Sequence, residues 1–191
     1  MSKILMGPQT LTYPQATVIV GTNVDGKPNF MAVGSCGDAN NEPPMVSVTI
    51  QHPRYTNIGI RQSMTFSVNI PSVGLIRETD YCGIVSGSRV NKAEVCQFRV
   101  FYGKLNSAPL IEQCPINLEC KVVHILDLGS HLVFVGRIEE THITESYLTD
   151  GKPDVTKIKP FIYISRDRRY LAFGEVIARA YSVGLELKAG E

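Results

Sequence analysis

A strand–turn–strand pattern near the N-terminus most constrains the fold of this chain. Residues 16–22 (ATVIVGT) form an almost uninterrupted apolar run, and residues 29–36 (NFMAVGSC) form a second run of similar length. The segment between them, NVDGKP, contains Asp25-Gly26 and Pro28, which are typical of a tight turn. This pattern predicts a β-hairpin whose first strand is buried on both faces.

Further strand-length runs occur along the chain. They are rich in Val and Ile, which favours strands, and the two longest are joined by Leu128-Gly129-Ser130-His131, which predicts a second hairpin. The expected strands are residues 45–51, 64–72, 116–129, 130–143 and 161–165. Together they predict a mainly β fold with short helices, and they favour a barrel while leaving a sandwich open.

The segments between these strands predict loops and short helices. Residues 37–44 (GDANNEPP) are rich in Gly, Asn and Pro and predict a loop. Residues 52–63 (HPRYTNIGIRQS) predict a short helix that starts at its proline, with Ile58 and Ile60 facing inward. Residues 72–87 show a weaker helical pattern.

Length and composition indicate an ordinary globular chain. The 191 residues are enough for a single domain spanning residues 1–191, and 43% of them are hydrophobic. The net charge of +1 provides no basic field for nucleic acid. The N-terminal MSKILMGPQT lacks the apolar core of a signal peptide, and no stretch has the apolar length of a membrane span. We therefore expect a cytoplasmic protein that does not associate with membranes.

The sequence offers no familiar catalytic or metal-binding motif. Its cysteines are odd in number and form no C-x-x-C pair, which argues against a disulfide scaffold and a zinc site. Glycine-rich nucleotide motifs are missing, as are the G-x-S-x-G and H-E-x-x-H patterns, and the four histidines are scattered. We expect no metal site and no catalytic acid, base or nucleophile. The five cysteines are Cys36, Cys82, Cys96, Cys114 and Cys120.

Eight short motifs occur in a fixed order over most of the chain. They are GKPNFMAVGS, PPxVxVxI, RYTNxxI, FSVNIP, SGSRVNK, LECKV, VGRI and PFIYI. In this order the chain resembles the flavin reductase-like, FMN-binding split-barrel family, to which flavoredoxins belong. The resemblance implies a split barrel that binds FMN, and a homodimer with each flavin at or near the subunit boundary. The chain departs from the family at Asn91 and Ala93, which flank Lys92 where an aspartate and an aromatic residue are usual, and it has no tryptophan.

The resemblance assigns the corner HPRYTN, residues 52–57, to the FMN phosphate. A phosphate needs donors and positive potential, which a helix start provides. Arg54 would add a charged fork, and Thr56 and Asn57 would add short hydrogen-bonding groups. Without the resemblance, an ordinary helix start with a surface arginine is the favoured interpretation of these residues.

The resemblance also places the strand from Asn29 to Ser35 against the flavin ring. Ala32, Gly34 and Ser35 are small, so the flat ring could approach their backbone closely. The alternative is a barrel strand whose small residues only pack tightly.

Two further segments are implied to complete the site. Thr49 and Ile50 would contact the ring or the ribityl chain, although Thr49 also suits a strand on propensity alone. Ser86, Gly87 and Lys92 of the SGSRVNK loop would close over the phosphate or ribityl chain. The alternative for Lys92 is a solvated loop lysine.

The function implied is electron transfer through bound FMN, because a flavoprotein leaves the redox chemistry to its cofactor. Electrons would come from NAD(P)H or a reduced donor and pass to flavin, ferric or protein acceptors. An alternative is a flavoredoxin-type carrier that links redox proteins and has no NAD(P)H site, and a third is a flavin-binding module without turnover. Cys36 follows Ser35 directly and is expected to be a packing residue instead of a redox-active thiol.

Overall fold

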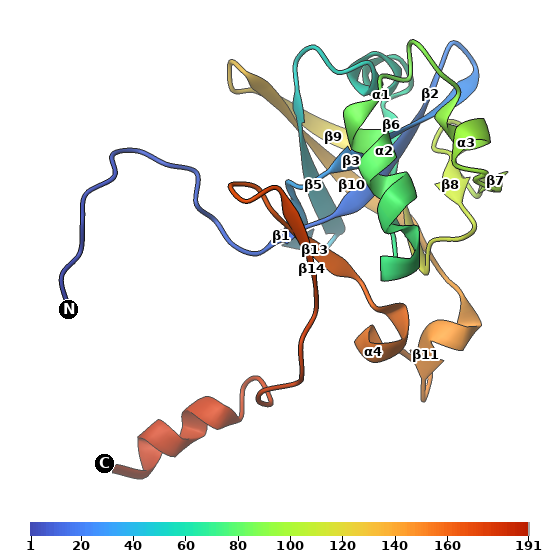
Figure 1. Cartoon of the computed structure of the whole chain (residues 1–191). Coiled ribbons are helices and arrows are strands. Elements are labelled where there is room, and N and C mark those ends of the chain that lie inside the picture. The colour runs from blue at the N-terminus through green and yellow to red at the C-terminus, as the bar shows by residue number, and fades with distance from the viewer. Residues whose placement is uncertain (191) are drawn as a thin grey trace.

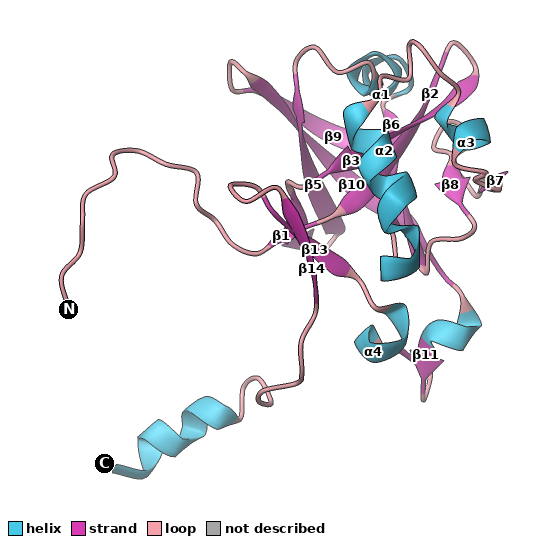
Figure 2. Ribbon diagram, in the orientation of Figure 1, coloured by secondary structure: helices cyan, strands magenta, loops and turns pink. Residues whose placement is uncertain are grey.

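A seven-stranded antiparallel sheet forms the centre of the protein (Figures 1 and 2), as a computed structural model describing residues 1–190 shows. Its strands are β2 (Val18–Val24), β3 (Lys27–Val33), β4 (Cys36–Asn41), β5 (Pro44–Gln51), β6 (Thr65–Ile70), β9 (Ile116–Asp127) and β10 (His131–Ile143). They lie in the order β3-β2-β6-β9-β10-β5-β4. Both predicted hairpins, β2–β3 and β9–β10, are present.

The sheet coils into an open barrel. Its edge strands are β3 and β4, and in the described part of the chain they do not pair with each other. The sheet is therefore open between β3 and β4. Where the chain passes from β3 to β4, the Thr49 N–H of β5 donates to the Ser35 carbonyl oxygen at 2.9 Å. The predicted mainly β fold is confirmed, and the barrel is split at this edge.

Alternate residues of the strands fill the inside of the barrel. Val18 and Val20 of β2 belong to the same buried core as Phe66 of the neighbouring strand β6 and Phe134 of β10, which are both fully buried. This alternation is expected for strands with one face toward a core. The barrel core comprises Val18, Val20, Met31, Val33, Val46, Val48, Ile50, Ile60, Phe66, Val68, Cys120, Val122, Leu132 and Phe134.

A second apolar cluster lies outside the barrel, where helices cover β2 and β3 (Figure 1). These helices are α2 (Ile76–Ile84) and α3 (Lys92–Val95). Ile19 and Phe30 of the strands are fully buried beneath them, and the Phe30 ring meets Phe98 edge-on with centroids 5.6 Å apart. Strand β2 is therefore buried on both faces, as its unbroken apolar run predicts.

Smaller elements complete the fold. A three-stranded sheet is formed by β1 (Gln15–Ala16), β13 (Phe161–Ile164) and β14 (Arg169–Ala172). The other short elements are α1 (Thr56–Ser63), η1 (Val73–Leu75), β7 (Val100–Phe101), β8 (Leu110–Ile111), η2 (Glu145–Tyr147), β11 (Leu148–Thr149), β12 (Lys152–Pro153), α4 (Val155–Ile158) and η3 (Val183–Gly190).

The structure corrects the loop predicted for residues 37–44, most of which belongs to β4. This segment lacks the apolar residues of a strand because its side chains are exposed from Gly37 onward. It is an edge strand that pairs on one side only, with β5. Backbone pairing with a neighbour has overridden the turn-like composition.

The predicted helix after β5 is present but begins later and turns a different face inward. Helix α1 begins at Thr56, and Pro53 lies in the turn before it. Ile60 is fully buried as predicted, whereas Ile58 is 46% exposed. Gly59 explains the orientation, because a Cβ there would lie only 2.3 Å from the Asn23 carbonyl oxygen of β2.

Both ends of the described chain extend away from the barrel (Figure 1). The N-terminal arm carries the exposed residues Ile4 and Leu5. The C-terminal segment leaves the body after β14 and exposes Phe173, Val176 and Ile177.

Candidate functional site

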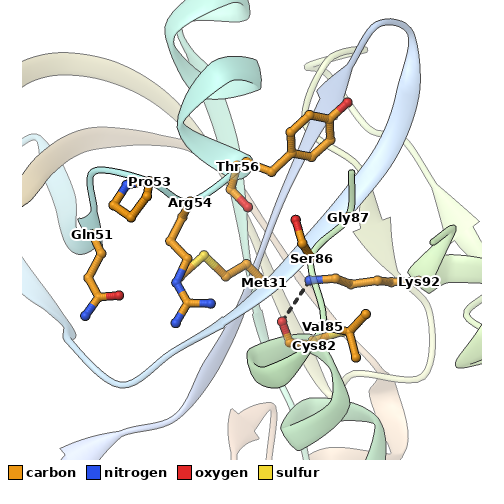
Figure 3. Close-up of a pocket in the computed structure, with 11 residues that line it drawn as sticks. Met31, Gln51, Pro53, Arg54, Thr56, Cys82, Val85, Ser86, Gly87 and Lys92 are labelled. Carbon is orange, nitrogen blue, oxygen red and sulfur yellow. Dashed lines mark hydrogen bonds between the residues drawn. The ribbon is translucent and has the colours of Figure 1, made fainter. Parts of the chain in front are cut away.

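A hollow of about 230 Å³ opens where β3, the corner before α1, the end of α2 and the loop leading to α3 meet (Figure 3). Arg54 and Lys92 enter it from opposite sides in this view, and the hydroxyl groups of Thr56 and Ser86 point toward it. Its lining residues are Met31, Gln51, Pro53, Arg54, Tyr55, Thr56, Cys82, Val85, Ser86, Gly87 and Lys92.

Arg54 links the corner to helix α2. Its Nη1 donates to the Gly83 carbonyl oxygen at 3.2 Å. A guanidinium group has five N–H donors, so this bond holds the side chain in place and leaves other donors for a ligand.

Lys92 is a buried cation, because the residue is only 4% exposed. Its Nζ donates to the carbonyl oxygens of Phe30 at 2.8 Å and Cys82 at 2.9 Å. Burial lowers the pKa of the ammonium group, and the nearby charge of Arg54 lowers it further. The alternative of a solvated loop lysine is therefore wrong.

The two cations have no acidic partner in the described part of the chain, where no salt bridge involves Arg54 or Lys92. A buried charge without a counter-ion is costly unless a ligand supplies one. The two cations repel each other across the same hollow, and an anion between them would relieve that repulsion. The electrostatics of this hollow therefore suit an anionic group.

Asn29, Thr56 and Gly87 hold three walls of the hollow together. The Asn29 Nδ2 group on β3 donates to Thr56 Oγ1 at the start of α1, at 2.9 Å. The Thr56 hydroxyl thus accepts from Asn29 and keeps its own hydrogen for another acceptor. A Cβ at Gly87 would lie 1.8 Å from Asn29 Oδ1, so only glycine allows the loop to approach β3 this closely.

The N-terminus of α1 adds backbone donors to the same corner. No side chain caps this helix at Tyr55, and its first turn contains no acidic residue. The Asn57 and Ile58 N–H groups already donate to the carbonyl oxygens of Arg54 and Tyr55, but all the first N–H groups lie at the positive end of the helix dipole. The corner is therefore a suitable anion-binding position.

Two more hollows adjoin the first. One, of about 320 Å³, shares Arg54 and runs along β3 past Ala32 and Gly34 toward Tyr163 and Tyr170. The other, of about 430 Å³, shares Tyr55 and Gly87 and is lined by Lys27, Asn29 and Arg89, among others. The three hollows give room for a ligand larger than a single anion.

Eight of the twelve residues predicted from the sequence line these hollows. They are Asn29, Ala32, Gly34, Arg54, Thr56, Ser86, Gly87 and Lys92.

The other four residues do not line them. Ser35 and Thr49 join β3 to β5 through their backbone groups. Ile50 is fully buried in the barrel core. The Asn57 Nδ2 group donates to the carbonyl oxygens of Gln51 at 2.8 Å and His52 at 3.0 Å, so this side chain shapes the corner from within.

Several lining residues were missed by the sequence analysis. Tyr55 lies between Arg54 and Thr56 and could have been included from its position alone. Tyr163 and Tyr170 come from the C-terminal strands, and the Tyr170 hydroxyl donates to Asp80 of α2 at 2.9 Å. Burial, together with this hydrogen bond, raises the pKa of Tyr170, which keeps the phenol neutral. No local pattern links these strands to α2.

Cys36 packs against the barrel core, as predicted. Burial raises the pKa of its thiol to about 12, and the charge of Asp38 contributes to the rise. The thiol is therefore protonated near neutral pH, which suits a packing residue.

The described residues contain no cluster of His, Cys, Asp and Glu suited to a metal ion. None of their helices has the length and apolar character needed to cross a membrane.

Comparisons with known proteins agree with the fold. Residues 10–172 match the family described as "Flavin reductase like domain". The structure superimposes on flavoredoxin from Methanosarcina acetivorans with a TM-score of 0.94 and 40% sequence identity, covering 98% of this chain and 100% of that one. Flavoredoxin of Desulfovibrio vulgaris gives a TM-score of 0.89 and 34% identity over 96% of this chain and 100% of that one. An uncharacterized protein of Archaeoglobus fulgidus is 34% identical over 144 residues, 75% of this chain and 80% of the relative.

Proposed function

Because the chain belongs to the flavin reductase-like domain family, we propose that it is an electron-transfer flavoprotein that binds FMN. The flavin would supply the redox chemistry, accepting electrons from a donor and passing them to an acceptor. The chain's own residues would bind the cofactor, orient it and set the polarity around it.

The observation that carries this proposal is the pair of uncompensated cations around one small hollow. Arg54 and Lys92 would bind the terminal phosphate of FMN, with Thr56, Ser86 and the start of α1 as further donors. A terminal monophosphate suits a hollow closed on several sides better than the pyrophosphate of FAD. FMN is therefore proposed over FAD.

The flavin ring would lie in the neighbouring hollow along β3. Ala32 and Gly34 leave the strand backbone open to a flat ligand, and Tyr163 and Tyr170 offer aromatic surface on the other wall. Arg54 lines both hollows and would mark the junction between the phosphate end and the ring end.

We favour an electron carrier between redox proteins, because both flavoredoxins resemble this chain over nearly its whole length. An NAD(P)H-dependent reductase is a second candidate. It is favoured by the hollow beside Lys27 and Arg89, which adjoins the proposed phosphate site and has room and positive charge for a second anionic ligand.

Rapid anaerobic mixing of the FMN-loaded protein with NADH and NADPH tests the two roles. The carrier predicts that the flavin absorbance persists with both nucleotides and bleaches with a reduced redox protein. Rapid bleaching by either nucleotide would favour the reductase. Failure to bind FMN at micromolar concentration would overturn the proposal as a whole.

We also propose that the protein forms a homodimer in a reducing compartment such as the cytoplasm. Dimer formation is supported by the apolar side chains exposed after β14, such as Val176 and Ile177. An apolar hollow of about 220 Å³ next to β1 and β13 could receive such side chains from a second copy. A reducing location is supported by the five cysteines, which are all free thiols. Sedimentation analysis of the full chain tests the dimer.

A further inference from the structure

Two cysteines from different helices meet beside the proposed flavin site. Cys82 lies in α2 and is 1% exposed, whereas Cys96 ends α3 and is partly exposed. Both belong to the apolar cluster that packs outside β2 and β3. The sequence gives them no shared motif, and nothing in the proposed electron transfer uses their thiols.

Contacts between the two helices place both thiols in the same part of the α2–α3 packing. The Lys92 Nζ group donates to the Cys82 carbonyl oxygen at 2.9 Å, which ties the start of α3 to α2. One turn later in α3, Cys96 Sγ lies 3.9 Å from the carbonyl oxygen of Glu78. Glu78 is four residues before Cys82 and so lies on the same face of α2. Each of the two thiols shifts the pKa of the other, as neighbouring groups do.

The two thiols differ in acidity. The hydrogen bond from Cys82 lowers the pKa of Cys96, and the charge of Lys92 adds to this, while burial and the charge of Glu78 oppose it. The same hydrogen bond, together with burial, raises the pKa of Cys82. Cys96 is also the more exposed of the two thiols, so both its position and the direction of its pKa shift favour it as the thiol that reacts, and a thiolate is the nucleophile in disulfide exchange.

Cys96 is also the thiol that a small reagent can reach. It lines a wide hollow of about 570 Å³ between α2 and α3, bounded by Arg77, Tyr81, Ile84 and Val95 among others. Cys82 lies on its inner side in the cluster. An exposed attacking thiol with a buried thiol behind it is the arrangement needed for a two-step exchange.

We propose that Cys96 and Cys82 form a redox-active thiol pair that reduces small disulfides, with Cys96 as the attacking thiol and Cys82 as the resolving thiol. In the first step Cys96 sulfur bonds to one sulfur of the small disulfide, whose S–S bond breaks and releases one thiolate. In the second step Cys82 loses its proton to solvent and attacks Cys96 sulfur, which releases the second thiolate. The released thiolates take up protons, so two electrons pass from the protein thiols to the small disulfide, and the protein keeps a Cys82–Cys96 disulfide.

This proposal does not depend on flavin binding and is tested on the full chain with and without FMN. The reduced protein is mixed with one equivalent of dithiodipyridine, a small uncharged disulfide whose thione product absorbs light. We expect fast release of both thiones, no adduct left on the chain, and a disulfide linking the tryptic peptides 78–89 and 93–99. Retention of the adduct, or a cross-link to another cysteine, would overturn the proposal without any variant being needed.

Variants separate the two roles. Cys96→Ala should slow the reaction by roughly tenfold or more, because the remaining thiols are buried or weakly acidic. Cys82→Ala should release one thione quickly and retain the other on Cys96. Cys114→Ala is the matched control, since Cys114 lies in the same cluster and burial raises its pKa; it should behave like the unmodified chain. A fast phase that survives Cys96→Ala, or is lost in Cys114→Ala, would refute the assignment.

Discussion

Replacing Arg54 by alanine should weaken FMN binding and leave riboflavin binding almost unchanged. Within the described residues the Arg54 side chain makes one hydrogen bond, to the Gly83 carbonyl oxygen, and its remaining N–H groups are available to the phosphate. A hydrogen bond involving a charged group contributes about 1.5–3 kcal/mol. The dissociation constant for FMN should therefore rise by roughly ten- to a hundredfold, at about 1.4 kcal/mol for each factor of ten.

Riboflavin is the internal control, because it has the ring and ribityl chain of FMN but no phosphate. Both ligands are titrated against each protein while the quenching of flavin fluorescence is followed. Arg61→Ala is the matched variant. It removes the same charge from the exposed last turn of α1, at the far end of the helix from Arg54. It should change the affinity for either ligand by less than about twofold, because exposed charges at this distance are screened by salt.

Equal losses for FMN and riboflavin in Arg54→Ala would mean that the residue supports the fold or the ring, through its bond to Gly83. No loss for either ligand would make the corner an ordinary helix start with a surface arginine. Thr56→Ala is less decisive, since Thr56 Oγ1 also accepts from Asn29 and its loss disturbs the wall of the hollow for both ligands.

Four other outcomes are expected. FMN affinity should fall as pH rises through the lowered pKa of Lys92, because the ammonium group proposed to bind the phosphate is then lost in the free protein; titrations at several pH values check this, with riboflavin as the control for the ring. Gly87→Ala should weaken both flavins in the same titrations, because its Cβ would displace the Asn29 side chain. Glu119→Gln should cost about 1–3 kcal/mol of unfolding free energy in urea, since this fully buried carboxylate accepts from the backbone of the 103–105 loop. Cys36→Ser should leave the rates of flavin reduction and reoxidation within a few-fold of the unmodified protein, and a loss of turnover with FMN still bound would contradict its role as a packing residue.

Much of the barrel could be predicted because its information is local. The β2–β3 hairpin is specified by two apolar runs and an Asp-Gly turn, all within about twenty residues. β4 was missed because an edge strand pairs on one side and needs few apolar side chains, so its sequence resembles a loop. Ile58 was placed inward because helical spacing alone does not reveal which face a close glycine contact selects.

The candidate site likewise divides into residues that are close together in the sequence and residues that only the fold brings together. Arg54 and Thr56 lie within three residues of each other, so the sequence shows them as one group. Tyr163 and Tyr170 could not be predicted in this way. They line the hollow along β3, proposed for the flavin ring, only because β13 and β14 pack beside α2. The small sheet has to form before these residues become neighbours of β3.

Lys92 shows why the contacts that could not be predicted from the sequence matter for function. In the sequence it follows a Ser/Gly-rich loop and looks solvated, and one of its two partners, the Phe30 carbonyl oxygen, is 62 residues away. Docking of α2 and α3 on β3 buries the ammonium group, which lowers its pKa and disfavours its charge. Carbonyl oxygens satisfy part of its hydrogen-bonding capacity but carry no full negative charge. The fold therefore holds a cation in a position where an anion would stabilise it further, and the same docking of α3 on α2 places Cys96 against α2 one turn before Cys82.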